Sequence, residues 1–482
     1  MIKHGQSEEP ATCAQQDPSL PEHAFAARPF TRRRLLALAP AGAAALALGA
    51  PAPAASAVPA AGTDRAALAQ EAYIWGFPLV MMETYLASAR EQKVPVNRLF
   101  VANSLATPAT KAGGPNNDTL FGSAWLDLSR EPQVVIVPDT DDRYYSIQLQ
   151  DVYTNTFAYI GRRTTGTRAG AYALTAPGWK GRLPRGVTRI AAPTAQVLAL
   201  TRTLVEGEAD LPAARAVQAK YALAPLSCYP ERAVPAEAVD EPLKFPIVDL
   251  SAQGAAYFDK LCQGLVAAPP PPGDRARLAR FAKIGIGPGR KPTRNAADVP
   301  VLAQAALDAN KRITQYVFAV GVNGWTVATG ITGFIKDPLY RAAITQYGPG
   351  THVSEEALYF TAHNGPDGQP LNGANRYALR FAAGELPPVD AFWSLTLYGQ
   401  DWRLVENPIQ RYSIGDRTTG LAYGDDGSLE LRIQNDEPSE GQANWLPAPT
   451  GSFILVLRTY QPGKALLDGS YEMPPITTAG SL

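Results

Sequence analysis

The residues best suited to binding a ligand form a run, Asn116, Asn117 and Asp118, in a loop flanked by glycine and proline. Amide and carboxylate oxygens can accept hydrogen bonds from a hydroxylated ligand or coordinate a hard cation such as Ca²⁺. The same side chains also form Asx turns, in which they accept hydrogen bonds from neighbouring backbone N–H groups. The run therefore predicts either a ligand-binding loop or a structural turn, and the sequence leaves both open.

A second polar candidate lies on a strand expected over residues 144–152. Side chains alternate between the two faces of a strand, so Tyr144, Ser146, Gln148 and Gln150 share one face. An aromatic ring beside two amides suits a sugar or another polar small molecule, but such a face also suits contact with solvent. We take Tyr144 and Gln148 as candidate ligand-binding residues.

The C-terminal third contains a comparable set of aromatic and polar residues. The set comprises Trp393, Tyr398, Asp401, Trp402, Arg411, Tyr412, Asn444 and Trp445. We take Arg411 and Tyr412 as candidate ligand-binding residues. Trp445 precedes an expected strand and is predicted to close a sandwich rather than to stack on a ligand.

Common catalytic motifs are absent from the sequence, and no catalytic residue is assigned. After the first 57 residues the histidines are His352 and His363, and neither lies in an HExxH pair, which argues against a histidine-rich metal site. No G-x-S-x-G elbow surrounds a serine. A pair of carboxylates needs no local motif, so an enzyme remains an open alternative, with cofactor and metal unknown.

The composition describes a globular protein with several domains. The 482 residues are 46% hydrophobic and 18% charged, and this length exceeds what one core ordinarily accommodates. The 44 basic residues equal the 44 acidic residues, so no strong net field attracts nucleic acid or anionic lipid, and polyanion binding is not expected. The 43 prolines and 41 glycines favour a turn-rich, mainly β architecture.

The N-terminal segment 1–57 resembles a twin-arginine export signal. It has a basic run at 31–34, an Ala/Leu-rich stretch over 35–50 and a small-residue cleavage site at 55–57. The apolar stretch is too short and too weakly hydrophobic to span a membrane well, so we expect cleavage and no stable membrane anchor. We therefore expect a periplasmic or secreted protein, in which Cys228 and Cys262 form either a disulfide or two buried thiols.

Hydrophobic periodicity divides the rest of the chain into four parts. The expected parts are an N-terminal helix over 58–94, a β-sandwich domain over 95–206, a mainly helical domain over 207–339 and a jelly-roll-like β domain over 340–482. The first helix is expected to be interrupted near Pro78. The glycine cluster 284–289 follows a helix rather than a strand, so it predicts a helix-ending turn rather than a nucleotide-binding loop.

Three segments of the first β region recur in the same order in the second. Residues 144–149 (YYSIQL) match 392–397 (FWSLTL), 160–166 (IGRRTTG) match 414–420 (IGDRTTG), and 192–203 match 448–459. The position differences are 248, 254 and 256, so one shift nearly serves all three. Three collinear matches predict two related β-sandwiches.

Residues present in both copies are more easily explained by folding than by a single ligand site. Arg163 and Arg417 occupy the same place in the two copies and are predicted to be turn or ion-pair residues. The residues that the copies do not share, Gln148, Asp151 and the 116–118 loop, are therefore the preferred candidates for function.

Several motifs are long enough to be specific. They are YIWGFP at 73–78, PNNDTL at 115–120, RYYS at 143–146, YIG at 159–161, FWSL at 392–395, the segment 407–417 and ANWLP at 443–447. Together they resemble a family of bacterial exported proteins that pair two domains of unknown function, numbered twelve fifty-four and twelve fourteen. The resemblance implies an immunoglobulin-like sandwich, a helical middle region and a C-terminal jelly-roll-like sandwich, but no established reaction.

The leading hypothesis is an exported protein that binds or acts on a polar small molecule or glycan in a cleft between the sandwiches and the helical region. One alternative is a non-enzymatic envelope or interaction protein. A second alternative is a metal-dependent enzyme exported in folded form, because twin-arginine export carries folded proteins.

Overall fold

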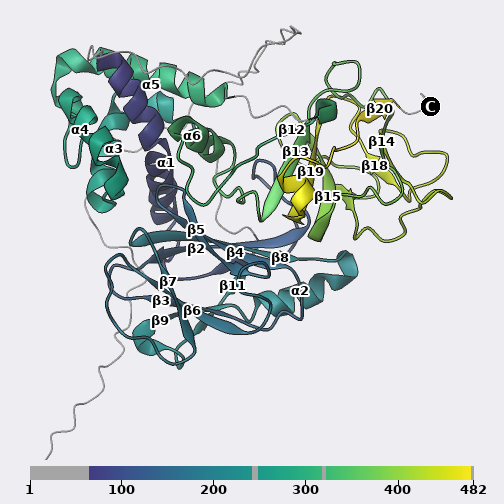
Figure 1. Cartoon of the computed structure of the whole chain (residues 1–482), viewed down its shortest axis with the longest axis horizontal. Coiled ribbons are helices and arrows are strands. Elements are labelled where there is room, and N and C mark those ends of the chain that lie inside the picture. Colours follow the sequence, from purple (N-terminus) through teal and green to yellow (C-terminus); the bar gives the residue numbers. More distant parts are fainter. Residues whose placement is uncertain (1–64, 241–247, 317–321, 479–482) are drawn as a thin grey trace, which may run out of the picture.

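The structure, a computed structural model, describes residues 65–240, 248–316 and 322–478. Figure 1 shows helices above a first β-sandwich, with a second sandwich to the right of the helices. The predicted export signal lies outside the described residues. Within the described part, no helix is long and apolar enough to cross a membrane.

The first sandwich consists of two sheets, with strand orders β11-β1-β2-β8-β4-β5 and β10-β9-β3-β6-β7. The strands are β1 (Phe100–Ala102), β2 (Thr119–Asp127), β3 (Gln133–Val137), β4 (Tyr145–Asp151), β5 (Thr156–Gly161), β6 (Gly170–Thr175), β7 (Val187–Ala191), β8 (Gln196–Leu204), β9 (Ala222–Pro225), β10 (Val234–Pro235) and β11 (Glu237–Val239). Tyr145, Ile147 and Leu149 of β4 pack in the core between the sheets, on the face opposite to Ser146 and Gln148.

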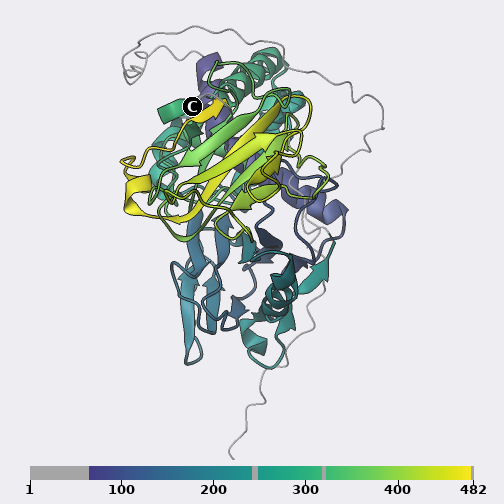
Figure 2. The same ribbon diagram turned by 90° about the vertical axis from the view of Figure 1, so that its right-hand side faces the viewer.

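The second sandwich also has two sheets, with orders β12-β13-β19-β15-β16 and β18-β17-β14-β20, and Figure 2 views it from its outer side. Its elements are β12 (Thr326–Val327), β13 (Ala357–Ala362), β14 (Tyr377–Phe381), β15 (Val389–Gly399), β16 (Ser413–Gly415), β17 (Leu429–Gln434), β18 (Trp445–Pro447), β19 (Phe453–Pro462), α7 (Lys464–Leu467) and β20 (Ile476–Thr478). The indole of Trp445 is buried, as expected for a residue that closes the sandwich. The predicted fold class, two sandwiches with a helical middle region, is confirmed.

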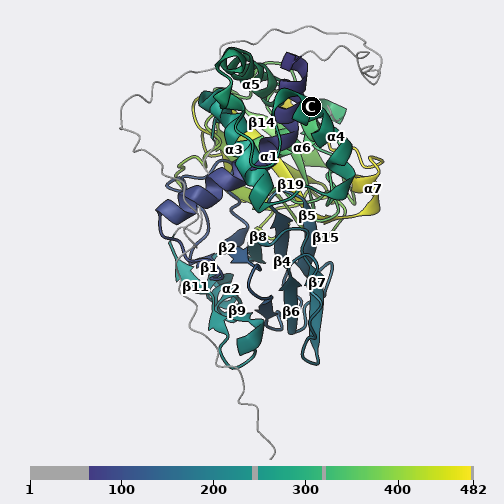
Figure 3. The same ribbon diagram turned by 90° about the vertical axis from the view of Figure 1, so that its left-hand side faces the viewer.

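The helical region packs on the first sandwich, as Figure 3 shows. Its helices are α1 (Arg65–Glu91), α3 (Ala256–Ala267), α4 (Arg275–Phe281), α5 (Val299–Thr314) and α6 (Pro338–Tyr347). The buried residues of α1 share one core with those of α3 and α5. The expected interruption of α1 does not occur, because Pro78 is accommodated inside a continuous helix in which residues 72–82 are all buried.

Two other expectations about the middle region can be compared with the structure. The helix that begins after Asp210 is α2 (Leu211–Gln218), and the chain then returns to the first sandwich as β9. Gly285 adopts a left-handed conformation at the end of a short 3₁₀ helix (Ala282–Ile284), so the prediction of a helix-ending turn is confirmed.

The internal sequence repeat is also a repeat of strand order and register. β4 lies between β8 and β5, and β15 lies between β19 and β16. Ser146 pairs with Arg202 in the first sheet, and Ser394 pairs with Arg458 in the second. These positions are the ones that the sequence match equates, so the prediction of two related sandwiches is confirmed.

One face of each repeated sheet points away from its own sandwich, and the two faces pack against each other. Tyr144 and Leu204 from the first sandwich form a cluster with Phe392 and Tyr460 from the second. The rings of Phe392 and Tyr460 stack with their centroids 4.0 Å apart. The polar face of β4 is therefore a buried contact surface rather than a solvated one.

Candidate functional site

Asp118 lies in the interface between the sandwiches, with only 3% of its side chain exposed. Its Oδ1 is 2.8 Å from Nη2 of Arg417, and its Oδ2 accepts a hydrogen bond of 2.6 Å from the Ser394 hydroxyl. The Arg417 guanidinium also lies over the ring of Phe392, 4.2 Å from the centroid. The carboxylate of the predicted binding loop therefore forms a structural ion pair.

The same contact occurs a second time with the roles of the sandwiches exchanged. Glu356 precedes β13 as Asp118 precedes β2, and Nε of Arg163 is 2.6 Å from its carboxylate. Each sandwich thus supplies one arginine and one carboxylate to the other, which is the reciprocal pattern of a two-fold-symmetric interface. The prediction that Arg163 and Arg417 are ion-pair residues is confirmed.

The two asparagines of the loop are also engaged by the protein. Asn116 accepts a hydrogen bond from the backbone N–H of Asp118 and donates one of 2.6 Å to the Tyr460 hydroxyl. Asn117 donates to a backbone carbonyl at 2.7 Å and accepts from the Ser413 hydroxyl at 3.3 Å. These contacts match the Asx-turn interpretation and join the loop to the second sandwich.

Three further predicted site residues support the fold. The Tyr144 hydroxyl donates to Glu356 at 2.9 Å within the interface. Arg411 donates to the backbone carbonyl of Trp445 at 2.8 Å. Tyr412 is half-buried and packs against a small apolar cluster that contains Tyr398. The structure does not assemble these three side chains around a shared cavity.

Gln148 and Asp151, which the repeat does not share, lie beside a pocket at the far end of β4. The amide of Gln148 donates 2.9 Å hydrogen bonds to the hydroxyl of Thr156 and the carbonyl of Thr351, both of which line the pocket. Asp151 is buried and accepts hydrogen bonds from Asn155, and burial raises the pKa of its carboxyl while those bonds oppose the rise. The two residues therefore support the pocket rather than face it.

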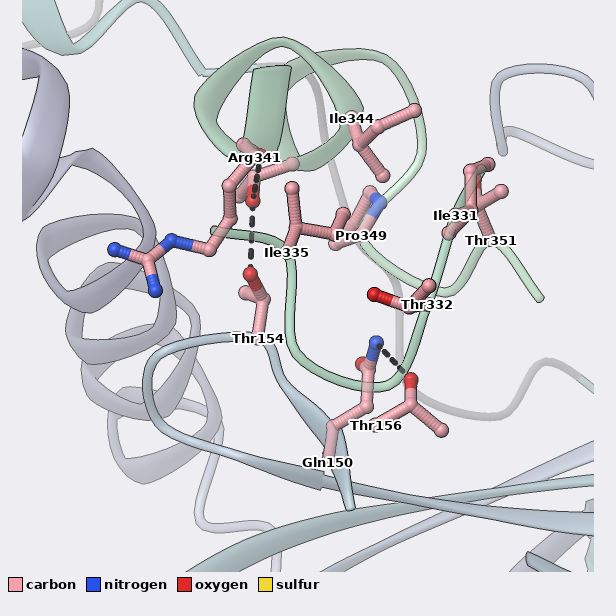
Figure 4. A pocket seen from close by; sticks show the side chains of 11 residues that line it. Gln150, Thr154, Thr156, Ile331, Thr332, Ile335, Arg341, Ile344, Pro349 and Thr351 are labelled. Carbon is pink, nitrogen blue, oxygen red and sulfur yellow. Dashed lines mark hydrogen bonds between the residues drawn. The ribbon is translucent and has the colours of Figure 1, made fainter. Parts of the chain in front are cut away.

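The pocket lies where the first sandwich, α6 and two irregular segments meet, and Figure 4 shows its walls. Its lining residues are Gln150, Thr154, Thr156, Ile331, Thr332, Ile335, Arg341, Ile344, Thr345, Pro349 and Thr351. The cavity volume is about 10 Å³ for the centre of a water-sized sphere, which is room for about one water molecule. Isoleucine side chains thus enclose a small polar space rimmed by threonine hydroxyls.

The amide of Gln150 has one atom without a protein partner. The side chain is 2% exposed, and its Nε2 donates to the Thr156 hydroxyl at 3.4 Å. Its Oε1 accepts no hydrogen bond from the residues that the structure describes. Exchanging the amide oxygen and nitrogen would leave the nitrogen free instead, so either orientation offers one polar atom to the pocket.

Arg341 contributes a partly buried cation at the edge of the pocket. Burial lowers the pKa of its guanidinium, although the carboxylates of Asp274 and Asp151 favour the charged form. Its Nε has no hydrogen-bond partner among the described residues. Figure 4 shows the guanidinium pointing away from the other labelled side chains, so it sets the charge near the pocket without filling it.

His352 follows the pocket residue Thr351 and is fully buried. Its Nδ1 lies 3.1 Å from the Tyr159 hydroxyl, and Nε2 has no partner within the described chain. Burial, assisted by the charges of Arg202 and Arg163, lowers the pKa of the imidazole well below its usual value. The ring is therefore neutral in the folded protein.

We expect this histidine to make the folded protein less stable in acid. Below about pH 6.5 this histidine takes up a proton in the unfolded chain but not in the folded chain. The free energy of unfolding is therefore highest above that pH and falls as the pH falls. Between pH 7.5 and 5.5 the wild-type free energy of unfolding should fall by about 1.4 kcal/mol more than that of His352→Gln. Denaturant titrations at the two pH values measure this difference. An equal fall in the free energy of unfolding for the two proteins would contradict it.

The pocket includes residues that the sequence interpretation did not select. Gln150 was placed on the same strand face as Gln148, so alternation could have identified it. Thr332 and Thr351 lie in irregular segments, where no periodic pattern marks a functional side chain. These two residues lie close to β4 only because of the tertiary fold.

The structure also bears on the cysteines and on metal binding. Cys262 is a buried free thiol, so a Cys228–Cys262 disulfide does not form. Burial raises the pKa of this thiol to about 11. Among residues 65–240, 248–316 and 322–478, no group of three or more His, Cys, Asp or Glu side chains is placed to hold a metal ion.

The fold and the pocket define a class of protein in which two β-sandwiches share a repeated strand unit and meet a helical region at a polar junction. Residues 96–225 match the family described as Protein of unknown function (DUF1254), and residues 356–464 match Protein of unknown function (DUF1214). The chain therefore carries a DUF1254 domain followed by a DUF1214 domain, the order that its motifs predicted.

Solved structures include similar chains. The VPA0106 protein from Vibrio parahaemolyticus aligns with a TM-score of 0.68 and 25% identity, over 86% of this chain and 99% of that one. A putative uncharacterized protein from Burkholderia cenocepacia aligns over 85% of this chain and 89% of that one, with 13% identity and a TM-score of 0.39. No curated protein matches the sequence significantly.

Proposed function

We propose that this protein binds a neutral polar small molecule, of the sugar or polyol class, in the pocket at the junction of the first sandwich and α6. The observation that carries the proposal is the Gln150 amide, which is buried, lines the pocket and keeps one hydrogen-bonding atom unused by the described residues. Buried polar groups are nearly always paired, so such an atom marks a place for a water or a ligand group. Thr332 and Thr351 line the same space.

A ligand larger than water requires one wall of the pocket to move. The wall formed by Ile331, Thr332 and Ile335 belongs to segment 328–337, which contains neither helix nor strand. Gly333 brings this segment close to β5, because a Cβ there would lie 2.6 Å from the Thr156 carbonyl oxygen. We infer that displacement of the segment admits the ligand, and that Gly333→Ala favours the displaced arrangement.

The central test of this proposal is Gln150→Leu. Removing the amide should weaken binding about tenfold or more, because a ligand hydroxyl would lose its buried partner. The same change should leave the free protein as stable or up to about 1 kcal/mol more stable, since an unpaired buried polar atom disappears. Gln304→Leu makes the same chemical change at an exposed position of α5 and serves as the control.

Binding is measured by saturation-transfer NMR with a panel of polyols and neutral mono- and disaccharides, followed by titration of each positive probe. Loss of the signal in Gln150→Leu, with the signal retained in Gln304→Leu, supports the proposed site. Equal signals in both variants would place binding elsewhere and refute it. A complete absence of binding by wild type and Gly333→Ala would favour the alternative of a non-enzymatic envelope or interaction protein.

We further infer that the protein acts outside the cytoplasm, because residues 1–57 have the composition of a twin-arginine signal. Comparing the mass of the protein recovered from the periplasm with that of the full chain tests this inference. Recovery of the uncleaved chain only from the cytoplasm would overturn it.

A further inference from the structure

We propose a second binding site, for a multiply charged phosphate-bearing anion, in a basic groove of the helical region. The groove has a volume of about 560 Å³ and lies between the start of α1 and the chain from Lys283 to Asp298. Pockets that bind small ligands commonly have volumes of several hundred Å³. The groove is separate from the junction pocket, and the two share no lining residue.

The charge of the groove is strongly one-sided. Arg65, Lys283, Arg290, Lys291 and Arg294 line it, against one carboxylate, that of Asp298. Five basic groups and one acidic group leave four positive charges in excess, although the whole chain has equal numbers of each. Because a concave surface focuses the field of such charges, the potential in the groove attracts anions.

Most of this charge is not used for folding. Arg65 is paired with Asp298 at 2.8 Å, and Arg290 donates to a backbone carbonyl at 3.1 Å. The side chains of Lys283, Lys291 and Arg294 make no hydrogen bond or ion pair with the residues that the structure describes. All three are exposed. They are therefore available to a ligand without breaking an internal contact.

Hydrogen bonds to residues of α3 fix the backbone at the floor of the groove. The backbone N–H of Gly287 donates to Sγ of Cys262 at 3.3 Å, and that of Gly289 donates to the Cys262 carbonyl at 2.9 Å. Farther along, the hydroxyl and N–H of Thr293 both donate to the carboxylate of Asp259 on α3. These contacts fix the backbone that carries the cations, so less freedom is lost when an anion binds.

The arrangement fits phosphate groups better than a single carboxylate. Arginine presents several N–H donors that match phosphate oxygens, and lysine adds a point charge. An excess of four positive charges matches a diphosphate more closely than a monoanion. The phosphates could belong to a soluble molecule or to a lipid headgroup, and the test separates these two sources.

The test uses inorganic pyrophosphate as the probe in calorimetric titrations of the purified protein at low salt. We expect saturable binding to one site that weakens as NaCl is raised. The charge reversals Lys291→Glu and Arg294→Glu should each weaken it about tenfold or more. Lys220→Glu, an exposed reversal just after α2, is the matched control and should leave the affinity unchanged.

A parallel measurement is cosedimentation with phosphatidylcholine vesicles that contain cardiolipin, whose headgroup bears two phosphates, using pure phosphatidylcholine vesicles as the reference. Cosedimentation that is lost in Lys291→Glu and Arg294→Glu assigns the site to a lipid headgroup, whereas pyrophosphate binding without cosedimentation assigns it to a soluble anion. The proposal is overturned if pyrophosphate shows no saturation up to about 5 mM, or if all three reversals change its affinity equally.

Discussion

Replacing Arg417 by alanine is expected to lower the free energy of unfolding by about 3–5 kcal/mol, the usual loss when one partner of a buried ion pair is removed. Asp118, whose side chain is 3% exposed in the wild-type protein, would keep the Ser394 hydroxyl as a partner but would lose its ion-pair partner among the described residues. The contact of the guanidinium with the ring of Phe392 would also be lost. Chemical denaturation followed by far-ultraviolet circular dichroism measures the loss.

The matched control is Arg380→Ala in the same sandwich. Arg380 also forms an ion pair with an aspartate, at 2.6 Å from Asp426, but the two side chains are 43% and 60% exposed. Exposed ion pairs contribute about 1 kcal/mol or less. Equal losses in the two variants would show that the Arg417–Asp118 contact is not desolvated as the structure places it.

Removing both partners separates the contribution of the ion pair to stability from the contribution of side-chain packing. Asp118→Ala in the Arg417→Ala background eliminates the uncompensated carboxylate, so the double variant should lose less stability than the sum of the single variants. A strictly additive result would contradict direct coupling of the two side chains. The pair Arg163–Glu356 provides an independent repetition, because it makes the equivalent contact from the other sandwich.

Gly415→Ala is expected to destabilise the protein by about 3 kcal/mol or more, because the new methyl group has no space. A Cβ at this position would lie 2.2 Å from the carbonyl oxygen of Trp393 on the adjacent strand, and backbone cannot move aside cheaply. Gly161, its counterpart in the first repeat, would meet the carbonyl oxygen of Tyr145 at 2.5 Å. We therefore expect Gly161→Ala to show the same effect.

The control is Gly451→Ala, where an added Cβ meets no atom within 4 Å. This variant should differ from wild type by less than about 1 kcal/mol. Denaturation midpoints of the three variants test the comparison. A Gly415→Ala protein as stable as Gly451→Ala would mean that the close approach of the two strands is not required by the fold.

These two predictions explain why the repeated motif has its composition. The glycine allows β16 to approach β15 closely, and the arginine two residues later forms the reciprocal ion pair. Neither residue requires a ligand to account for it. The shared motif therefore describes how two copies of one strand unit pack together, and function has to be sought where the copies differ.

Much of this organisation could be predicted from the sequence. Strand alternation separated the two faces of β4, and the three matched segments implied two related sandwiches, because both patterns can be read from residue order along the chain. The repeat also marked Arg163 and Arg417 as turn or ion-pair residues. It could not identify their partners, which lie about 200 or more residues away in the sequence.

The tertiary structure alone decided which polar residues remain available to a ligand. Asn116, Asn117 and Asp118 have the composition of a binding loop, but the second sandwich covers them and uses their hydrogen bonds. Gln150, on the same strand face as Gln148, keeps a free polar atom because β4 extends past that interface to a junction of remote segments.

The local pattern of residue types thus determined the elements, the repeat and the faces of each strand. Which face is covered, and by what, depends on contacts between segments hundreds of residues apart. The balanced composition likewise concealed the basic groove, because net charge is a sum over the chain whereas a binding potential depends on where the charges lie in space.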